Sequence, residues 1–411
     1  MKIALISPSP PDLYAPGVRI LSSYLKSYGH QTKLILLAGG TEKLSFGGQY
    51  IYQFQDHVID RVIELSKDAN LIGISFMTQY FDRALQLTKR LKETTGVPII
   101  WGGIHPTLCP EEGVAHADMV CVGEGEEALL ELMEKMETGR DYYDTKNFWF
   151  RKNGNVIRNE IRPLVRDLDT FPFQDYDFKD QYVYDPIQDS IVLLTEEMFE
   201  GLFSMAPDLD GKMKPSYKIM ATRGCPMNCT FCAASVLKKM FYPHKYVRHR
   251  SVENVIQELQ EVTKRFPSIK LIQFFDDILF HLKTDYIRDL SSLYKERIGL
   301  PFYCQASATT LNEQKLRYLL DAGLIWVEIG IQSGSERTNQ IYERRVSNAQ
   351  VLEAANLLNK YKDKMLSPCY HVILDSPWEA EEDLLETLNL IMQLPIPYWI
   401  KLASLVFFPR T

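Results

Sequence analysis

Three cysteines that lie close together carry the clearest chemical signal in this sequence. They are Cys225, Cys229 and Cys232, spaced C-x3-C-x2-C in the run TRGCPMNCTFCAAS. Three such thiolates suit three irons of a cubane cluster and leave the fourth iron open to a small chelating ligand. A structural zinc site is the alternative, because it needs four ligands and His244 follows in the chain. The cysteine run therefore predicts a metal centre, with an iron-sulfur cluster favoured by the spacing.

Alternating strands and helices surround this run and must position it. We expect strands at Lys218–Thr222, Leu271–Phe275, Phe302–Ala306, Trp326–Ile331, Tyr370–Leu374 and Trp399–Val406. We expect helices at Val252–Phe266, Asp285–Arg297, Glu313–Ala322, Ala349–Tyr361 and Glu381–Leu394. Six such steps predict a partial (βα)6 barrel of the TIM type over residues 215–411, with its site at the carboxyl ends of the strands. The cysteines follow the first strand directly, so they lie at that edge.

The N-terminal part of the chain alternates in the same way. Strands are predicted at Lys2–Ser7, Thr32–Leu37, Leu71–Phe76, Val97–Gly102 and Met119–Val122. Helices are predicted at Val18–Tyr28, Ile51–Ser66, Tyr80–Thr95 and Glu126–Thr138. This pattern predicts an α/β domain with a doubly wound, Rossmann-like parallel sheet over residues 1–145. Ligands of such sheets bind beyond the carboxyl ends of the strands.

The loops after the third, fourth and fifth of these strands hold the candidate ligand contacts. Paired glycines permit close approach of backbone to a bulky ligand, and the GEGE turn opens a helix whose amides suit a polar or anionic group. A tight turn explains each glycine pair equally well. The candidates are Ser75, Phe76, Gly102, Gly103, Gly123, Glu124 and Gly125.

Residues 146–214 separate the two alternating regions. The run NFWFRKNGNVIRN predicts a hairpin around an Asn-Gly turn. The rest is rich in Asp, Pro and aromatic residues without a sustained period. We interpret it as a connecting segment on the surface, with one short helix near Thr195–Phe203.

Composition narrows the class of protein. The 411 residues suggest two or three domains, and the net charge of -7 argues against a nucleic-acid binder. No run approaches the ~20 apolar residues of a membrane helix. The apolar run at the N-terminus is too short for a signal peptide. The sequence therefore predicts a cytoplasmic protein, in which clustered cysteines bind metal rather than form disulfides.

The motif CPMNCTFC, including Phe231 before its last cysteine, resembles the signature of radical S-adenosylmethionine (SAM) enzymes. The resemblance implies a [4Fe-4S] cluster on the three cysteines, with SAM chelating the open iron. An electron from the cluster, supplied by a donor such as flavodoxin or ferredoxin, would cleave SAM to a 5'-deoxyadenosyl radical. The protein would position the groups and exclude water.

The same resemblance points to further SAM contacts at the strand ends. A capping or solvated polar role is the alternative for each of them. The fifth strand departs from the family, because Asp375 and Trp378 stand where relatives have glycines. The candidates are Asp276, Asp277, Gln305, Ser307, Glu328 and Ser333.

The N-terminal domain resembles cobalamin-binding domains through its three strand-end loops. Many such domains carry a histidine ligand after the first strand, whereas this chain reads SPSPPDLYAPG there. The resemblance therefore implies cobalt without a histidine from that loop. His105 is expected to be a hydrogen-bonded structural residue, and Cys109 and Cys121 are expected to be inert thiols.

Together the two resemblances imply a cobalamin-dependent radical methyltransferase acting on a small molecule or natural product. Cobalamin would carry a methyl group to an unactivated atom. A cyclase, a ring-rearranging or oxidising enzyme without net methyl transfer, and a radical enzyme whose N-terminal domain binds no cobalamin stay open as alternatives. Relatives usually continue past the sixth strand, which implies that this sequence is a fragment or a short variant.

Overall fold

The computed structural model describes residues 1–8, 15–46 and 49–411, with side chains left out over residues 43–51. The chain divides into two compact units, described separately here. The first comprises Met1–Leu164 and Thr170–Leu202, and the second comprises Val165–Asp169 and Phe203–Thr411. The predicted domain boundaries at residues 145 and 214 stay a prediction.

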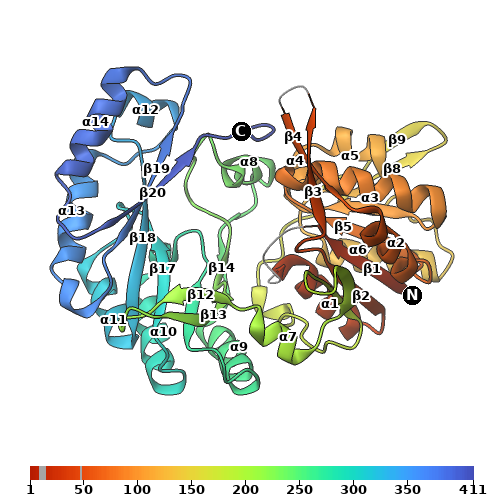
Figure 1. Cartoon of the computed structure of the whole chain (residues 1–411), viewed down its shortest axis with the longest axis horizontal. Helices are drawn as coiled ribbons and strands as arrows, with labels where there is room; N and C mark the ends of the chain where they lie inside the picture. Colours follow the sequence, from red (N-terminus) through yellow and green to blue (C-terminus); the bar gives the residue numbers. More distant parts are fainter. Residues whose placement is uncertain (9–14, 47–48) are drawn as a thin grey trace. The chain divides into compact units, whose positions relative to one another are not determined.

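A nine-stranded sheet forms the first unit, drawn from red to yellow-green in Figure 1. Its order is β11-β10-β2-β1-β5-β6-β7-β8-β9, and its central strands β2-β1-β5-β6-β7 are parallel. This is the doubly wound arrangement that the sequence predicts. The strands are β1 (Lys2–Ser7), β2 (Gln31–Leu36), β5 (Leu71–Ser75), β6 (Ile99–Gly102), β7 (Met119–Cys121), β8 (Phe148–Lys152), β9 (Asn155–Arg158), β10 (Gln181–Asp185) and β11 (Ser190–Leu193).

Helices cover this sheet in two groups. Helices α1 and α6 contact each other, while α3 contacts both α2 and α5. The apolar side chains of each helix lie on one face, as in α2, where Val58, Ile59 and Val62 are buried. The helices are α1 (Pro16–Ser27), α2 (Asp56–Ser66), α3 (Phe81–Thr94), α4 (Ile104–Leu108), α5 (Pro110–His116), α6 (Glu126–Glu137) and α7 (Glu196–Gly201).

The predicted helix Ile51–Ser66 is wrong at its start. Strands β3 (Thr41–Phe46) and β4 (Gln49–Phe54) form an antiparallel hairpin, and helix α2 begins only at Asp56. The alternating, aromatic-rich run QYIYQF suits a strand better than a helix. Its end is fixed by Gln86, whose side chain bonds both the N–H and the C=O of Phe54 at 2.8 and 2.9 Å.

The connecting segment does more than wrap the surface, so that interpretation also needs correction. Strand β10 pairs parallel with β2, and β11 extends the sheet further. The buried Arg19 on α1 explains the docking, because its guanidinium donates 2.7 Å bonds to Asp175 O and Gln181 Oε1. The predicted hairpin is confirmed as β8–β9, with Asn153 and Gly154 both at positive φ.

Six parallel strands and one antiparallel edge strand form the second unit, drawn from green to blue in Figure 1. The order β12-β13-β16-β17-β18-β19-β20 leaves β12 and β20 as open edges, so the predicted partial (βα)6 barrel is confirmed. The strands are β12 (Ser204–Pro207), β13 (Met213–Ile219), β16 (Leu271–Phe274), β17 (Phe302–Ala306), β18 (Leu324–Gln332), β19 (Cys369–Leu374) and β20 (Trp399–Ser404). A small ribbon pairs β14 (Thr222–Arg223) with β15 (Arg248–His249).

The helices of this unit follow their strands as expected. Side chains cap several of them, as where Asn312 accepts from the N–H of Lys315 and Gly323 ends the helix at φ +112. The short helix α8 directly after the cysteines was not predicted. The helices are α8 (Ala233–Met240), α9 (Val252–Arg265), α10 (Thr284–Arg297), α11 (Glu313–Ala322), α12 (Glu336–Ile341), α13 (Asn348–Asn359) and α14 (Glu381–Met392).

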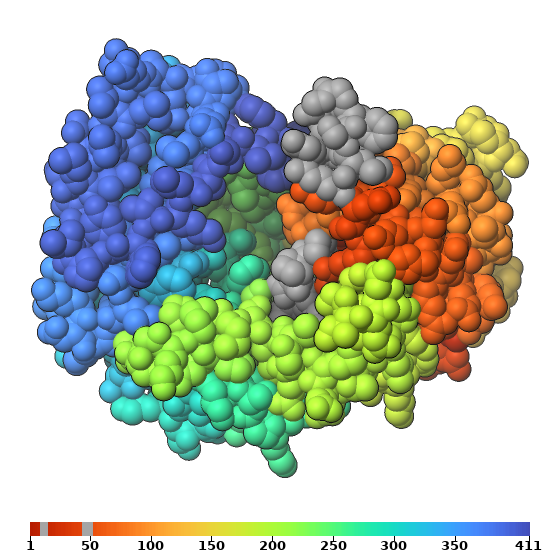
Figure 2. Space-filling view, viewed as in Figure 1, coloured from red at the N-terminus to blue at the C-terminus, as the bar shows by residue number. Residues whose placement is uncertain are grey.

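Helix α14 and the edge strand β20, which belong to the part of the chain drawn in blue in Figure 2, expose apolar side chains. Leu388, Met392, Trp399 and Leu402 are all more than half exposed. Apolar surface of this extent is typical of faces that contact other molecules or segments. Among the described residues, no helix is long and apolar enough to cross a bilayer.

Candidate functional site

The cysteine loop begins where the first barrel strand ends. After β13 and β14 the chain turns at Gly224, whose φ is +92. A Cβ atom at this position would lie 2.8 Å from the backbone oxygen of Tyr246, so only glycine fits. The turn delivers Cys225 to the carboxyl end of the strand, and Cys232 ends the loop as the N-cap residue of α8.

Two of the three thiols, those of Cys225 and Cys232, lie in surroundings that disfavour free thiolates. Cys229 is buried, and Cys225 and Cys232 are half-buried free thiols. Burial raises the pKa of Cys225 to about 12, although the backbone N–H of Met227 opposes the shift. Burial also raises the pKa of Cys232, against the N–H of Ala234. Such thiols ionise when a metal replaces the proton, so the pocket fits metal-bound thiolates with backbone donors to sulfur.

Contacts to the chain after β18 hold the middle of the loop. The N–H of Thr230 donates to Tyr342 O at 3.1 Å, and its hydroxyl donates to Ile341 O at 3.0 Å. The ring of Phe231 packs edge-on against Tyr342 with centroids 5.0 Å apart. Phe231 therefore anchors the loop, and a contact of its ring with a cofactor stays a prediction.

The side chain of Arg344 reaches the same loop. Its Nη1 lies 3.6 Å from Cys229 Sγ, and its Nη2 donates to Gly330 O at 2.7 Å. An N–H donated to a cluster sulfur is one of the means by which proteins set cluster potentials. Sequence reasoning missed this residue, because no local pattern distinguishes it from the neighbouring Arg345.

The geometry argues against the zinc alternative. Two sulfurs on one tetrahedral zinc, each ~2.3 Å from the metal, lie about 3.8 Å apart. Among the described residues, the groups of Cys, His, Asp and Glu whose ligand atoms all lie within 4.8 Å of one another do not include Cys225, Cys229 and Cys232 together. His244 is exposed. The three thiols therefore do not lie as close together as the ligands of one zinc ion do.

Asp276 binds the backbone that leads into the cysteine loop. Its carboxylate accepts bonds from the N–H groups of Ala221 and Thr222 and from the Thr222 hydroxyl, at 3.2, 2.6 and 2.6 Å. These bonds draw the backbone out of the sheet, which explains why β13 ends at Ile219 and not at the predicted Thr222. Burial raises the pKa of Asp276 to about 6. Asp277 is exposed, and its charge raises the pKa of both Cys225 and Cys232.

A row of polar side chains crosses the strands of the barrel. Gln305 on β17 pairs in register with Glu328 on β18, and His371 on β19 pairs with Lys401 on β20. Gln305 Nε2 and His371 Nε2 lie 3.4 and 3.7 Å from Glu328 Oε2. Burial alone would raise the pKa of Glu328, but His371, Lys401 and Gln305 hold it below its usual value. The sequence analysis identified two members of this row and missed His371 and Lys401.

The other two strand-end candidates have local partners. The Ser307 hydroxyl lies 3.1 Å from that of Thr309, in a turn after β17. The buried Ser333 hydroxyl lies 3.2 Å from Glu379 Oε1 and 3.1 Å from Thr387 Oγ1, and so links β18 to α14. Both side chains serve the packing of the strand ends, and a direct role toward SAM stays a prediction for each.

Asp375 adopts a backbone conformation that favours glycine. Its φ is +61, in the left-handed region that Asp and Asn tolerate better than most residues. Ser404 donates a 2.5 Å bond to its carboxylate. The turn after β19 therefore has the backbone conformation in which glycine is usual, with an aspartate in its place.

In the first unit, the candidate loops lie on neighbouring strands. Ser75 at the end of β5 pairs in register with Gly102 at the end of β6. A Cβ atom on Gly102 would meet no atom within 4 Å, so open space adjoins this backbone. Gly123 donates its N–H to Thr107 Oγ1 at 3.0 Å and brings the next loop, with Glu124 and Gly125, to the same edge. The edge fits a bulky ligand that lies against backbone.

Contacts within the protein explain the presence of Gly103 and Phe76 in these loops, without a ligand. Gly103 has φ +95, and a Cβ atom there would lie 2.7 Å from Phe76 O. The close approach is thus between two loops of the protein. Phe76 is buried and packs edge-on against Trp101 at 5.0 Å. Residues 9–14 of the first-strand loop, where a histidine ligand was expected to be absent, lie outside the described residues.

Two family models match the chain in the same order as its two units. The B12 binding domain matches residues 3–133, and the radical SAM superfamily matches residues 219–391. Residues 3–133 thus match a B12-binding domain and residues 219–391 match a radical SAM domain. The cofactors that go with these two domains are cobalamin, and a [4Fe-4S] cluster with SAM.

Named relatives agree with this assignment. The chain is 27% identical over 336 residues to the uncharacterized methyltransferase PH0819 of Pyrococcus horikoshii, covering 80% of this chain and 66% of the relative. It is 23% identical to the anaerobic magnesium-protoporphyrin IX monomethyl ester cyclase of Rubrivivax gelatinosus, covering 90% of this chain and 60% of that protein. The chain thus spans less than two thirds of the length of either relative.

A solved structure shares the whole fold. The radical SAM methyltransferase TsrM from Kitasatospora setae, solved with cobalamin and a [4Fe-4S] cluster bound, aligns over 100% of this chain and 73% of its own. The TM-score is 0.72 at 14% sequence identity. At this identity the likeness concerns the architecture.

Proposed function

We propose that the chain is a cobalamin-dependent radical SAM methyltransferase acting on a small organic molecule, with an external one-electron donor. The observation that carries the proposal is the loop of Cys225, Cys229 and Cys232, held at the carboxyl ends of a partial barrel in a chain that also has a B12-binding domain. When bound, the cluster supplies the electron that cleaves SAM, and cobalamin carries the methyl group.

The residues of the barrel have separate proposed tasks. Cys225, Cys229 and Cys232 bind three irons, and the bonds from Thr230 and the packing of Phe231 keep their loop in place. Arg344 brings a positive charge to the Cys229 sulfur. Electrostatic groups that are fixed before the reaction stabilise charge without reorganisation.

The polar row inside the barrel is the proposed contact surface for SAM and substrate. Glu328 is held as a carboxylate by His371 and Lys401, so it can accept hydrogen bonds from hydroxyl or ammonium groups. Gln305 adds an amide beside it. In the first unit, Ser75, Gly102 and the turn at Gly123 are the proposed cobalamin contacts.

Product analysis tests the proposed reaction. The reconstituted protein is supplied with cobalamin, SAM and dithionite under anaerobic conditions, and products are followed by mass spectrometry. The methyltransferase predicts both 5'-deoxyadenosine and S-adenosylhomocysteine. 5'-Deoxyadenosine alone would favour a reaction without methyl transfer, such as that named for the cyclase relative. Neither product, with an intact cluster, would overturn the proposal for this chain.

A further inference from the structure

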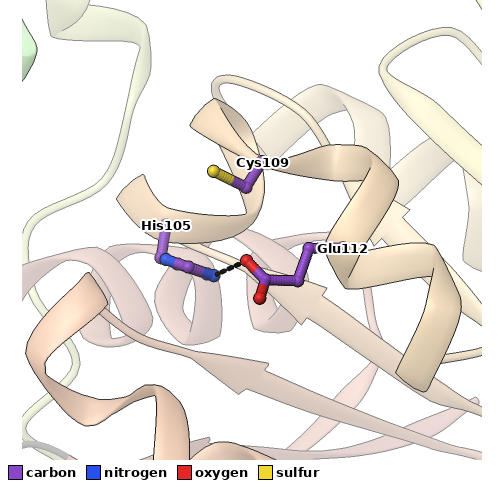
Figure 3. Close-up of side chains that lie close together, drawn as sticks. All are labelled: His105, Cys109 and Glu112. Carbon is purple, nitrogen blue, oxygen red and sulfur yellow. Dashed lines mark ion pairs between the residues drawn. The ribbon is translucent and has the colours of Figure 1, made fainter. Parts of the chain in front are cut away.

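Three metal-ligating side chains meet at the surface of the first unit, apart from the cysteine loop. His105 comes from α4, Glu112 comes from α5, and Cys109 is the residue between the two helices. The ligand atoms of all three lie within 4.8 Å of one another. Figure 3 shows the imidazole and the carboxylate facing each other, with the thiol on the adjoining turn.

The His105 ring is held in a fixed position. It is 2% exposed, and it lies against Phe76 and Phe81, with ring centroids 5.5 and 5.0 Å away. Its Nδ1 lies 3.2 Å from Thr78 Oγ1. Metal-binding histidines usually bond a neighbour through one ring nitrogen, which fixes the tautomer and presents the other nitrogen to the metal.

The other ring nitrogen has an unusual environment. His105 Nε2 is buried and makes no hydrogen bond of good geometry with any of the described residues. It nevertheless lies 3.2 Å from Glu112 Oε2. Two ligand atoms that share one tetrahedral zinc, each at ~2.0–2.2 Å, are about 3.4 Å apart. The observed separation is therefore close to that of two ligands of a single ion.

We propose that His105 Nε2, Cys109 Sγ and the Glu112 carboxylate bind one zinc ion. Nitrogen, sulfur and oxygen together suit a borderline-soft divalent ion, and water completes the tetrahedron because Glu112 is exposed. The proton of the Cys109 thiol leaves to solvent as the metal binds. This role goes beyond the inert thiol that the sequence predicts at Cys109.

The ordinary alternative is a His–Glu ion pair. An ion pair involves only His105 and Glu112, whereas the Cys109 thiol also lies within 4.8 Å of both of their ligand atoms. The site would tie together α4 and α5 beside the loop after β5, to which His105 is linked by its backbone N–H, which donates to Phe76 O at 3.4 Å.

The test uses the full chain with its cluster assembled, so that the three cluster cysteines are occupied. Zinc is added, excess metal is removed, and the bound ion is quantified by mass spectrometry and examined by zinc-edge X-ray absorption. The proposal predicts one zinc ion per chain, with one sulfur at ~2.3 Å and nitrogen or oxygen at ~2.0–2.2 Å. Cys109→Ser and Glu112→Gln should each weaken zinc binding more than about tenfold.

Control variants test whether a loss of zinc binding is specific to the proposed ligands. Glu111→Gln changes the neighbouring exposed carboxylate of α5 and should retain zinc at the wild-type level. Replacement of Cys225, Cys229 and Cys232 together by serine removes both the cluster and its thiols and should leave this site intact, so its outcome is independent of the proposed radical chemistry. Glu112 is exposed, so its variant is expected to fold, which circular dichroism checks. Zinc binding unchanged in Cys109→Ser, or a metal shell without sulfur, would overturn the proposal.

Discussion

Arg344 Nη1 lies 3.6 Å from Cys229 Sγ, which places a permanent positive charge beside a cluster ligand that is more than a hundred residues away in sequence. The guanidinium is fixed by its bond to Gly330 O on β18. A cluster gains negative charge on reduction, so this cation stabilises the reduced state. Strand β18, which carries Glu328 of the polar row, therefore also fixes the arginine that influences the potential of the cluster.

Replacement of Arg344 by methionine should therefore lower the cluster midpoint potential. We expect a fall of about 60 mV, equivalent to about 1.4 kcal/mol for one electron, because a charged hydrogen-bond donor to sulfur is lost. Spectroscopic redox titration of the reconstituted protein measures it. Arg345→Met is the matched control, since Arg345 is exposed. An equal shift in both variants would show that the contact to Cys229 does not matter.

Asp276 should make stability depend on pH in a defined direction. Its pKa is raised to about 6 from 3.8, so between those values the folded state binds more protons than the unfolded state. The free energy of unfolding should therefore fall as pH rises through this window, by about 2–3 kcal/mol from this residue. Denaturant unfolding at pH 4 and pH 6.5 measures the difference.

Asp276→Asn should remove that part of the pH dependence. The lost acceptor should cost about 1–3 kcal/mol above pH 6, where Asp276 is ionised, because an amide cannot accept from both Ala221 and Thr222. Asp289→Asn, at an exposed position, is the control. A pH slope in Asp276→Asn equal to that of the wild type would contradict the assignment.

Adjacent glycines at the end of β6 should respond differently to alanine. Gly103→Ala should cost about 1–3 kcal/mol, since φ is +95 and the Cβ would lie 2.7 Å from Phe76 O. Gly102→Ala should leave stability within about 0.5 kcal/mol, because its Cβ points into open space. Thermal unfolding measures both.

Cobalamin binding should be sensitive to alanine at Gly102, the position where alanine has little effect on stability. A methyl group on Gly102 extends into the space proposed for the corrin, so Gly102→Ala should weaken cobalamin binding more than its effect on stability explains. Titration followed by visible absorbance measures the affinity. Unchanged affinity in a stable Gly102→Ala protein would remove Gly102 from the proposed contacts.

The sequence predicted both sheets because buried parallel strands and amphipathic helices leave strong periodic patterns. Strand β17 and helix α11 have the bounds that were expected. The hairpin β3–β4 and the added strands β10–β11 were missed, since short strands are fixed by distant partners such as Gln86 and Arg19. Such contacts leave no local signal.

In the candidate site, too, local patterns were predicted and residues brought together by distant contacts were missed. Three cysteines in one run identify the cluster loop without any structure. His371 and Lys401 approach Glu328 only because neighbouring strands bring them together: His371 pairs with Gly330, two residues beyond Glu328, and Lys401 pairs with His371. Asp375 stands where the family resemblance implies glycine, and the structure shows that it has the positive φ of +61 that glycine favours.

The central claim is that the three cysteines leave one iron open to SAM. Electron paramagnetic resonance of the anaerobically reconstituted, dithionite-reduced protein tests it most directly. We predict a reduced [4Fe-4S] signal that changes when SAM is added and that is lost in Cys229→Ala. A cluster signal that SAM leaves unchanged, or one that persists in Cys229→Ala, would contradict the account.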